Sequence, residues 1–181
     1  ELKTVTFANS FGAEDMVITD IILKNQLAIE IFSLDTGRLP VETYDLMAET
    51  EKHYSTKLNV YFPQAQVVEF YVKSHGINAF YESIDLRKSC CHMRKVEPLQ
   101  RALKDKAAWV TGMRAAQATT RSSLPVREFD EANKLEKFNP LSDWTEQEVW
   151  AYIRLHKVPY NALHDQFYPS IGCAPCTRAI A

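Results

Sequence analysis

Short apolar runs and helical repeats alternate along the first half of the sequence, and this alternation limits the folds that the chain can adopt. The runs at 4–8 and 29–34 have the length and composition of buried strands. Each is followed by a polar turn and a segment with apolar residues at helical spacing. Strands are expected at 4–8, 29–34 and 58–62, and helices at 16–26, 41–56 and 65–75. This order predicts an α/β fold, with a Rossmann-like open parallel sheet flanked by helices.

The second half of the sequence continues the pattern less regularly. A helix that carries Cys90 and Cys91 is expected to continue to about Leu103, with a kink or break near Pro98. A strand at 107–111, a polar and basic loop at 112–123, a hairpin at 126–138 and a helix after the capping box at 145–148 are expected to follow. The loop is interpreted as an active-site loop, and a solvated loop with incidental arginines is the alternative.

Composition limits the class of protein. With 181 residues, 46% of them hydrophobic, the chain suits one domain, residues 1–181. A net charge of −2 gives no sign of a nucleic-acid surface. The sequence has no run of transmembrane length and no signal-peptide layout at its start, so a soluble cytoplasmic protein is expected. Basic residues gather around the motifs, which suits a small anionic ligand: Arg87, Lys88, Arg94, Lys95, Arg114, Arg121, Arg127 and Arg178.

Four cysteines occur in two pairs, Cys90-Cys91 and Cys173-Ala-Pro-Cys176. Four thiolates can bind either zinc or an iron–sulfur cluster. Adjacent cysteines on a helix diverge by roughly 100°, which favours a wide cluster over a single ion. Zinc, disulfides and unrelated buried thiols remain alternatives.

The turn from the first strand into the first helix, Asn9 to Asp15, has the layout of a phosphate-binding loop. Gly12 allows close backbone approach, Ser10 offers a hydroxyl, and a helix N-terminus attracts anions. An ordinary strand-to-helix turn is the alternative. The second strand ends in Asp35-Thr-Gly-Arg38, and in an open parallel sheet both loops lie at the ligand-binding edge.

Two long motifs carry a resemblance to a known family. Cys90-Cys-x-x-Arg-Lys-Val-Glu-Pro-Leu and Ile171-Gly-Cys-x-Pro-Cys-Thr-Arg178 resemble the assimilatory adenylylsulfate reductases, over nearly the whole chain. The Leu34-Asp-Thr-Gly-Arg38 stretch also resembles a loop of the adenine nucleotide alpha hydrolase-like fold.

The resemblance implies an enzyme of sulfate assimilation and cysteine biosynthesis that converts adenosine 5′-phosphosulfate to sulfite and AMP. It implies a 4Fe-4S cluster bound by Cys90, Cys91, Cys173 and Cys176. It also implies reduction by thioredoxin or a similar dithiol, and no nucleic-acid or membrane partner. Homo-oligomerisation is left open.

The resemblance also assigns roles to individual residues. Lys95 is expected between the cluster and the substrate sulfate, and Arg121 on the phosphosulfate. The phosphate side is expected to be lined by Ser10, Phe11, Gly12 and Ala13. The adenine side is expected to be formed by Leu34, Gly112, Asp35, Thr36 and Arg38. Arg94 and Glu97 are expected to form ion pairs near the cluster.

The sequence departs from the family in two places. Residues 1–181 lack the Glu-Cys-Gly-Leu-His stretch whose cysteine is the family's nucleophile, so a fragment or an omitted tail is expected. The loop Ser10-Phe-Gly-Ala-Glu-Asp15 also lacks the Ser-Gly-Gly pattern of ATP pyrophosphatases, which disfavours pyrophosphate release. Alternatives are a phosphoadenylylsulfate reductase, or a nucleotide-binding or thiolating protein with a four-cysteine metal site and no reductase activity.

Overall fold

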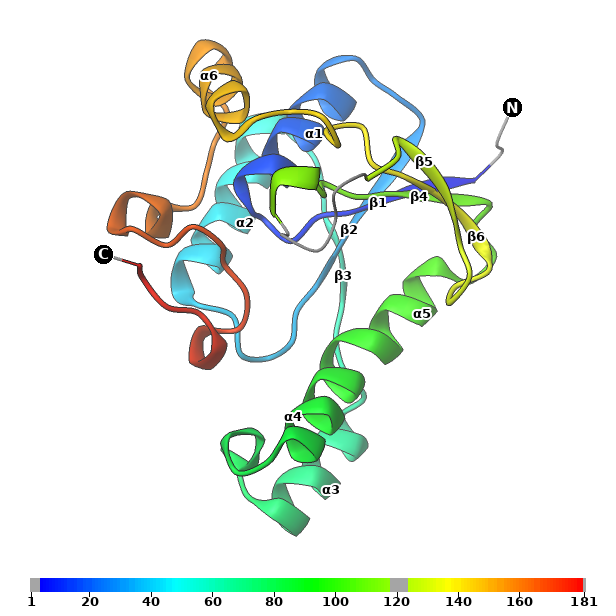
Figure 1. Cartoon of the computed structure of the whole chain (residues 1–181), viewed down its shortest axis with the longest axis vertical. Helices are drawn as coiled ribbons and strands as arrows, with labels where there is room; N and C mark the ends of the chain where they lie inside the picture. Colours follow the sequence, from blue (N-terminus) through cyan, green and yellow to red (C-terminus); the bar gives the residue numbers. More distant parts are fainter. Residues whose placement is uncertain (1–3, 118–123, 181) are drawn as a thin grey trace.

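The computed structural model describes residues 4–117 and 124–180, which include a six-stranded sheet in the order β3-β2-β1-β4-β6-β5 (Figure 1). The strands are β1 (Val5–Ala8), β2 (Ile29–Leu34), β3 (Asn59–Tyr61), β4 (Ala108–Val110), β5 (Arg127–Asp130) and β6 (Leu135–Phe138). All pairs are parallel except β5 with β6. The expected parallel sheet is confirmed, and the antiparallel pair is the expected hairpin.

The helices lie close to their expected bounds, except that α1 begins at Ala13, three residues before its expected start at Met16. They are α1 (Ala13–Lys24), α2 (Val41–Tyr54), α3 (Ala65–His75), α4 (Ile84–Cys91), α5 (Glu97–Leu103) and α6 (Glu146–His156). Short turns of other helix types lie at η1 (Ala79–Tyr81), η2 (His92–Val96), η3 (Ala115–Gln117), η4 (Ala162–Gln166) and η5 (Ala174–Cys176). The capping box at Thr145 and Glu148 is present. Across the described ranges, the structure contains no helix that is both apolar and long enough to cross a membrane.

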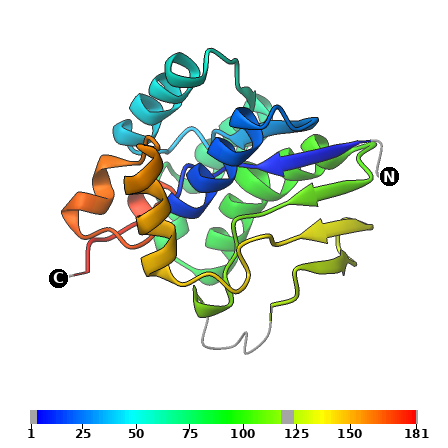
Figure 2. The ribbon, with the colours of Figure 1, turned by 90° about the horizontal axis from the view of Figure 1, so that it is seen from above.

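Helices cover both faces of the sheet, because strand side chains alternate between two apolar clusters. On one face, Phe7 packs with residues of α1, α2 and α6, and α1 and α6 lie side by side (Figure 2). On the other face, Phe32 packs with Ala102 and Leu103 of α5. A third, small cluster joins α3 to α4, which project together from the body of the protein (Figure 1).

The helix with the first cysteine pair runs from α4 through a π-helical turn, η2, into α5. The expected continuation to Leu103 is confirmed, and the expected irregularity is this π turn, directly before Pro98. Proline has no N–H to donate and its ring crowds the preceding turn, so a wider turn there is physically reasonable. π turns inside α-helices occur frequently at functional sites.

A buried carboxylate joins three helices on the first face. Asp20 of α1 is fully buried and accepts hydrogen bonds from Tyr54 Oη of α2 at 2.7 Å and from Tyr152 Oη of α6 at 2.9 Å. Lys24 Nζ, one turn along α1, lies 2.9 Å from the same carboxylate. The helices behind the ligand-binding edge are therefore tied together by one charged group.

Candidate active site

Three loops meet at the carboxyl edge of the sheet, where the chain order changes direction. From β1 the chain proceeds outward to β2 and β3, whereas β4 lies on the other side of β1. The loops after β1, β2 and β4 are residues 9–12, 35–40 and 111–114. In open α/β sheets, ligands bind at such a switch point.

Hydrogen bonds within the loop after β1 and to α1 hold two of its expected substrate-binding residues, the exposed Ser10 and the buried Phe11. Ser10 Oγ donates to Asp15 Oδ2 at 2.6 Å. Phe11 is fully buried in the core, with a left-handed φ of 63° that Asn9 Oδ1 supports by accepting its N–H at 2.6 Å. Gly12 is the N-cap of α1, and Ala13 lines an open cavity.

The loop after β2 contacts the second cysteine pair. Thr36 is buried, and its Oγ1 accepts a hydrogen bond from Cys173 Sγ at 3.2 Å. The carbonyl of Arg38 accepts the N–H of Ala174 at 2.8 Å. Asp35 Oδ1 accepts the N–H of Gly37 at 2.7 Å, which holds the turn. These side chains therefore organise the cysteine segment, a role that the sequence did not indicate; Leu34, at the end of β2, is partly buried.

All four cysteines line one cavity of about 160 Å³, called here the sulfur-lined cavity. The other residues around it are Arg38, Phe80, Arg87, Arg94, Lys95 and Pro175. Its two halves come from α4 with η2 and from the segment around η5, which is held by Tyr81 Oη donating to the Pro175 carbonyl at 2.7 Å. Four positive side chains therefore surround four thiols. Within the described ranges, no three histidine, cysteine or acidic side chains are grouped closely enough to bind a single metal ion.

Arg94 links the sulfur-lined cavity to the loop after β2. It is buried, its Nη1 donates to the Thr36 carbonyl at 2.5 Å, and its Nε has no hydrogen-bond partner among the residues described. Burial raises the pKa of the Cys90 thiol, and the neighbouring guanidinium of Arg94 acts in the opposite direction. The expected ion pairing of Glu97 beside the cysteines is wrong: Glu97 instead pairs with Arg101 at 2.7 Å, because the two are one turn apart on α5.

Lys95 lies beside the C-terminal segment. It is half-buried, and its Nζ would be 3.8 Å from a Cβ added to Gly172. Arg121, the other expected catalytic residue, lies outside the residues that the structure describes.

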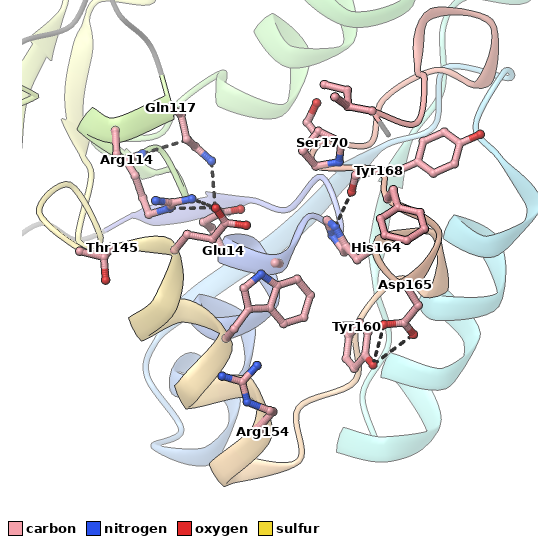
Figure 3. A pocket seen from close by; sticks show the side chains of 17 residues that line it. Glu14, Arg114, Gln117, Thr145, Arg154, Tyr160, His164, Asp165, Tyr168 and Ser170 are labelled. Carbon is pink, nitrogen blue, oxygen red and sulfur yellow. Dashed lines mark hydrogen bonds and ion pairs between the residues drawn. The ribbon is translucent and has the colours of Figure 1, made fainter.

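A larger, open cavity of about 1210 Å³ begins at Ala13 and Glu14 (Figure 3). Glu14 accepts hydrogen bonds from Arg114 Nε at 2.8 Å and Gln117 Nε2 at 2.9 Å. The opposite wall, in Figure 3, is formed by the segment with His164 and Tyr168. Of these residues, the sequence had singled out Ala13 and Arg114, and the rest were missed because the wall assembles from segments far apart in the chain.

The fold and its loops define a doubly wound α/β domain of the kind that binds a ligand at the carboxyl edge of its sheet, here beside four thiols. The chain belongs to the phosphoadenosine phosphosulfate reductase domain family, whose model matches residues 4–179.

Curated relatives agree with this family. The chain is 58% identical to an adenosine 5′-phosphosulfate reductase of Allochromatium vinosum over 99% of its own length and 70% of the relative's. It is 54% identical to the enzyme of that name from Burkholderia cepacia, over 97% of this chain and 70% of that one. Among solved structures, a phosphoadenylyl-sulfate reductase from Candida auris superposes with a TM-score of 0.82 at 34% identity, covering 97% of this chain and 83% of that chain.

Proposed function

We propose that this chain is the reductase domain of an assimilatory adenosine 5′-phosphosulfate reductase. The convergence of Cys90 and Cys91 with Cys173 and Cys176 around one cavity, beside the ligand-binding edge, carries the proposal. Relatives 44–58% identical that bear this name support it. The product is sulfite, which supplies cysteine biosynthesis, and the domain comprises residues 1–181 of a cytoplasmic protein.

The cofactor in this proposal is a 4Fe-4S cluster held by the four cysteines. A zinc–sulfur distance of about 2.3 Å would draw all four sulfurs around one point. In this structure the four thiols instead surround a cavity of about 160 Å³. The cationic rim and the unpartnered Nε of Arg94 suit an anionic cluster with sulfide acceptors. Such a cluster supplies a fixed local charge and joins the two cysteine segments.

The reaction in this proposal is attack by a thiolate on the sulfur of the substrate. The sulfur–oxygen bond to the phosphate breaks, AMP leaves with the electron pair, and an S-sulfonate remains on the nucleophilic cysteine. Thioredoxin or a similar dithiol then releases sulfite and is itself oxidised to a disulfide. Because a thiolate approaches an anion, Lys95 and Arg121 have the role of offsetting repulsion and stabilising the leaving phosphate.

The substrate-binding residues in this proposal follow the loops at the switch point. The backbone of residues 10–13 faces the phosphate, and Leu34 and Gly112 offer backbone groups to the adenine. Asp35, Thr36 and Arg38 act through the shape of their loop.

The first prediction tests the cofactor. Protein prepared without oxygen is expected to be brown and to contain about four irons per chain with matching sulfide. The measurement is iron, zinc and sulfide analysis with a visible spectrum. A colourless, fully loaded protein with one zinc per chain would favour the zinc alternative.

The substrate is tested by equilibrium binding. Adenosine 5′-phosphosulfate and AMP are expected to compete for one site, and the 3′-phosphorylated substrate to bind more weakly. The likeness to a phosphoadenylyl-sulfate reductase structure makes this comparison necessary. Tighter binding of the 3′-phosphorylated substrate would support that alternative, and binding of neither would contradict the proposal.

The second prediction concerns Lys95. Lys95→Ala is expected to weaken adenosine 5′-phosphosulfate about 10- to 150-fold, the loss of one charge-assisted contact, and AMP much less. Lys88→Ala is the matched control, because Lys88 is exposed on the same helix and does not line the sulfur-lined cavity. Equal losses for both nucleotides would place Lys95 away from the sulfate.

A further inference from the structure

Asp15 is a buried carboxylate in the first turn of α1. It is 8% exposed. Its Oδ2 accepts both the backbone N–H of Ser10 at 2.7 Å and the hydroxyl of Ser10 at 2.6 Å. The loop after β1 is therefore fastened to the helix that it precedes.

The same carboxylate contacts the loop after β4. A Cβ added to Gly112 would lie 2.0 Å from Asp15 Oδ1, closer than two atoms can approach, and 3.2 Å from its Cγ, which is a tight contact. The backbone N–H of Gly112 also donates to the carboxylate. A side chain at residue 112 would therefore have to displace the Asp15 carboxylate.

These two loops leave adjacent parallel strands, in which Phe7 of β1 is paired with Val110 of β4. Beyond the last paired residues, the strands diverge at the switch point and the sheet no longer sets the distance between the loops. The buried Asp15 carboxylate, which accepts hydrogen bonds from both loops, sets the distance between them instead. The neighbouring charges are Glu14 on the same helix and Arg114 on the loop after β4, and they are paired with each other at 2.7 Å.

We propose that Asp15 is a positioning residue of the substrate site, whose ionised carboxylate holds the Ser10 loop and the Gly112 loop at the spacing that an adenylated sulfate requires. The inference rests on the proposed function. It adds a residue that touches neither the substrate nor the sulfurs and acts through the two loops.

The ionisation of Asp15 makes the inference testable by pH. Burial raises the pKa of Asp15 to about 6, against the hydrogen bonds from Ser10 and Gly112, which lower it. A protonated carboxyl has an O–H donor of its own, which would face the N–H and O–H donors of the two loops. The loops therefore lose the acceptor that they share. Substrate affinity is therefore expected to fall as pH falls through about 6.

Folding stability is expected to change in the opposite direction. Because the folded pKa is raised, this group's contribution to stability is fully present at low pH and is lost as pH rises through about 6. A carboxylate that served only the stability of the fold would show the change in folding stability with pH but no fall in substrate affinity on acidification.

The experiment measures adenosine 5′-phosphosulfate binding by the chain between about pH 5 and pH 8, where the ligand's own charges do not change. Asp15→Asn keeps the shape but offers one acceptor, and it is expected to weaken binding about tenfold or more near pH 7.5 and to remove the pH step. Asp20→Asn is the matched control: a buried carboxylate five residues further along the same helix, bonded to Tyr54 and Tyr152 rather than to the loops, whose loss should affect unfolding and leave affinity and its pH step unchanged.

Gly112→Ala tests the same contact from the other side, because its added Cβ must displace the Asp15 carboxylate. It is expected to weaken binding as Asp15→Ala does, and the double variant to be no weaker than Asp15→Ala alone. Normal binding by Asp15→Asn, additive losses in the double variant, or tighter binding on acidification would each overturn the inference while the proposed function stands. A wild-type chain that does not bind the nucleotide would overturn both.

Discussion

A polypeptide of residues 1–181, incubated with adenosine 5′-phosphosulfate that carries radioactive sulfur, is expected to bind the nucleotide and to acquire no covalent label. The four cysteines of this sequence all line the sulfur-lined cavity. If each is an iron ligand, its thiolate electrons are engaged and none is free to attack sulfur. The measurement is protein-bound radioactivity after denaturation, with iron content measured in parallel.

The control extends the polypeptide with a C-terminal Glu-Cys-Gly-Leu-His segment, which is expected to restore stoichiometric label that a dithiol releases. The same extension with serine in place of cysteine should remain unlabelled. Stoichiometric, thiol-releasable label on Cys90, Cys91, Cys173 or Cys176 with the iron retained would contradict both the ligand assignment and the mechanism.

The largest expected effect on folding is that of Asp20→Ala. It leaves the hydroxyls of Tyr54 and Tyr152 without their acceptor between α1, α2 and α6. A fully buried hydroxyl without a partner costs about 1–3 kcal/mol, and these two are part-buried, so a loss of about 3 kcal/mol for the pair is expected, a large part of the roughly 5–15 kcal/mol typical of whole domains. Chemical denaturation measures it, with the exposed Glu131→Ala as a control that should change little.

The same cluster predicts an alkaline limit to stability. Burial and the nearby Asp20 raise the pKa of Tyr152 to about 12, and that of Tyr54 rises for the same reasons. A raised folded pKa means that the contribution is present below about pH 10, the ordinary tyrosine pKa, and is lost as pH rises towards 12. Between about pH 10 and pH 12 the free energy of unfolding of the wild type should therefore fall more steeply with pH than that of Asp20→Ala. Equal slopes would show that Asp20 does not raise the pKa values of the two tyrosines.

Most of the fold could be predicted because its signals are local. Periodicity alone predicted β2 at Ile29–Leu34 and α3 at Ala65–His75 with the bounds that the structure has. Capping chemistry at Thr145 correctly predicted the start of α6. The order of elements also placed the loops after β1 and β2 at one edge, because parallel strands end together.

The site was predicted in its members more than in their roles. The two cysteine pairs were expected to converge, and they line one cavity. The sequence did not indicate that the hydroxyl of Ser10 contacts Asp15 or that the hydroxyl of Thr36 contacts Cys173. Nothing in the sequence distinguishes a hydroxyl that faces a ligand from one that holds a loop.

The sequence by itself determined which segments form strands and helices, where α2, α3 and α6 begin, and which thiols are available, since these depend on neighbours within a few residues. Only the tertiary structure decided that β4 lies beside β1, which brings Gly112 against Asp15, and that Arg94 reaches the Thr36 carbonyl. Those contacts join residues 58 or more positions apart. They follow from strand order and from the space left between packed elements, and a one-dimensional pattern of apolar and polar residues contains neither.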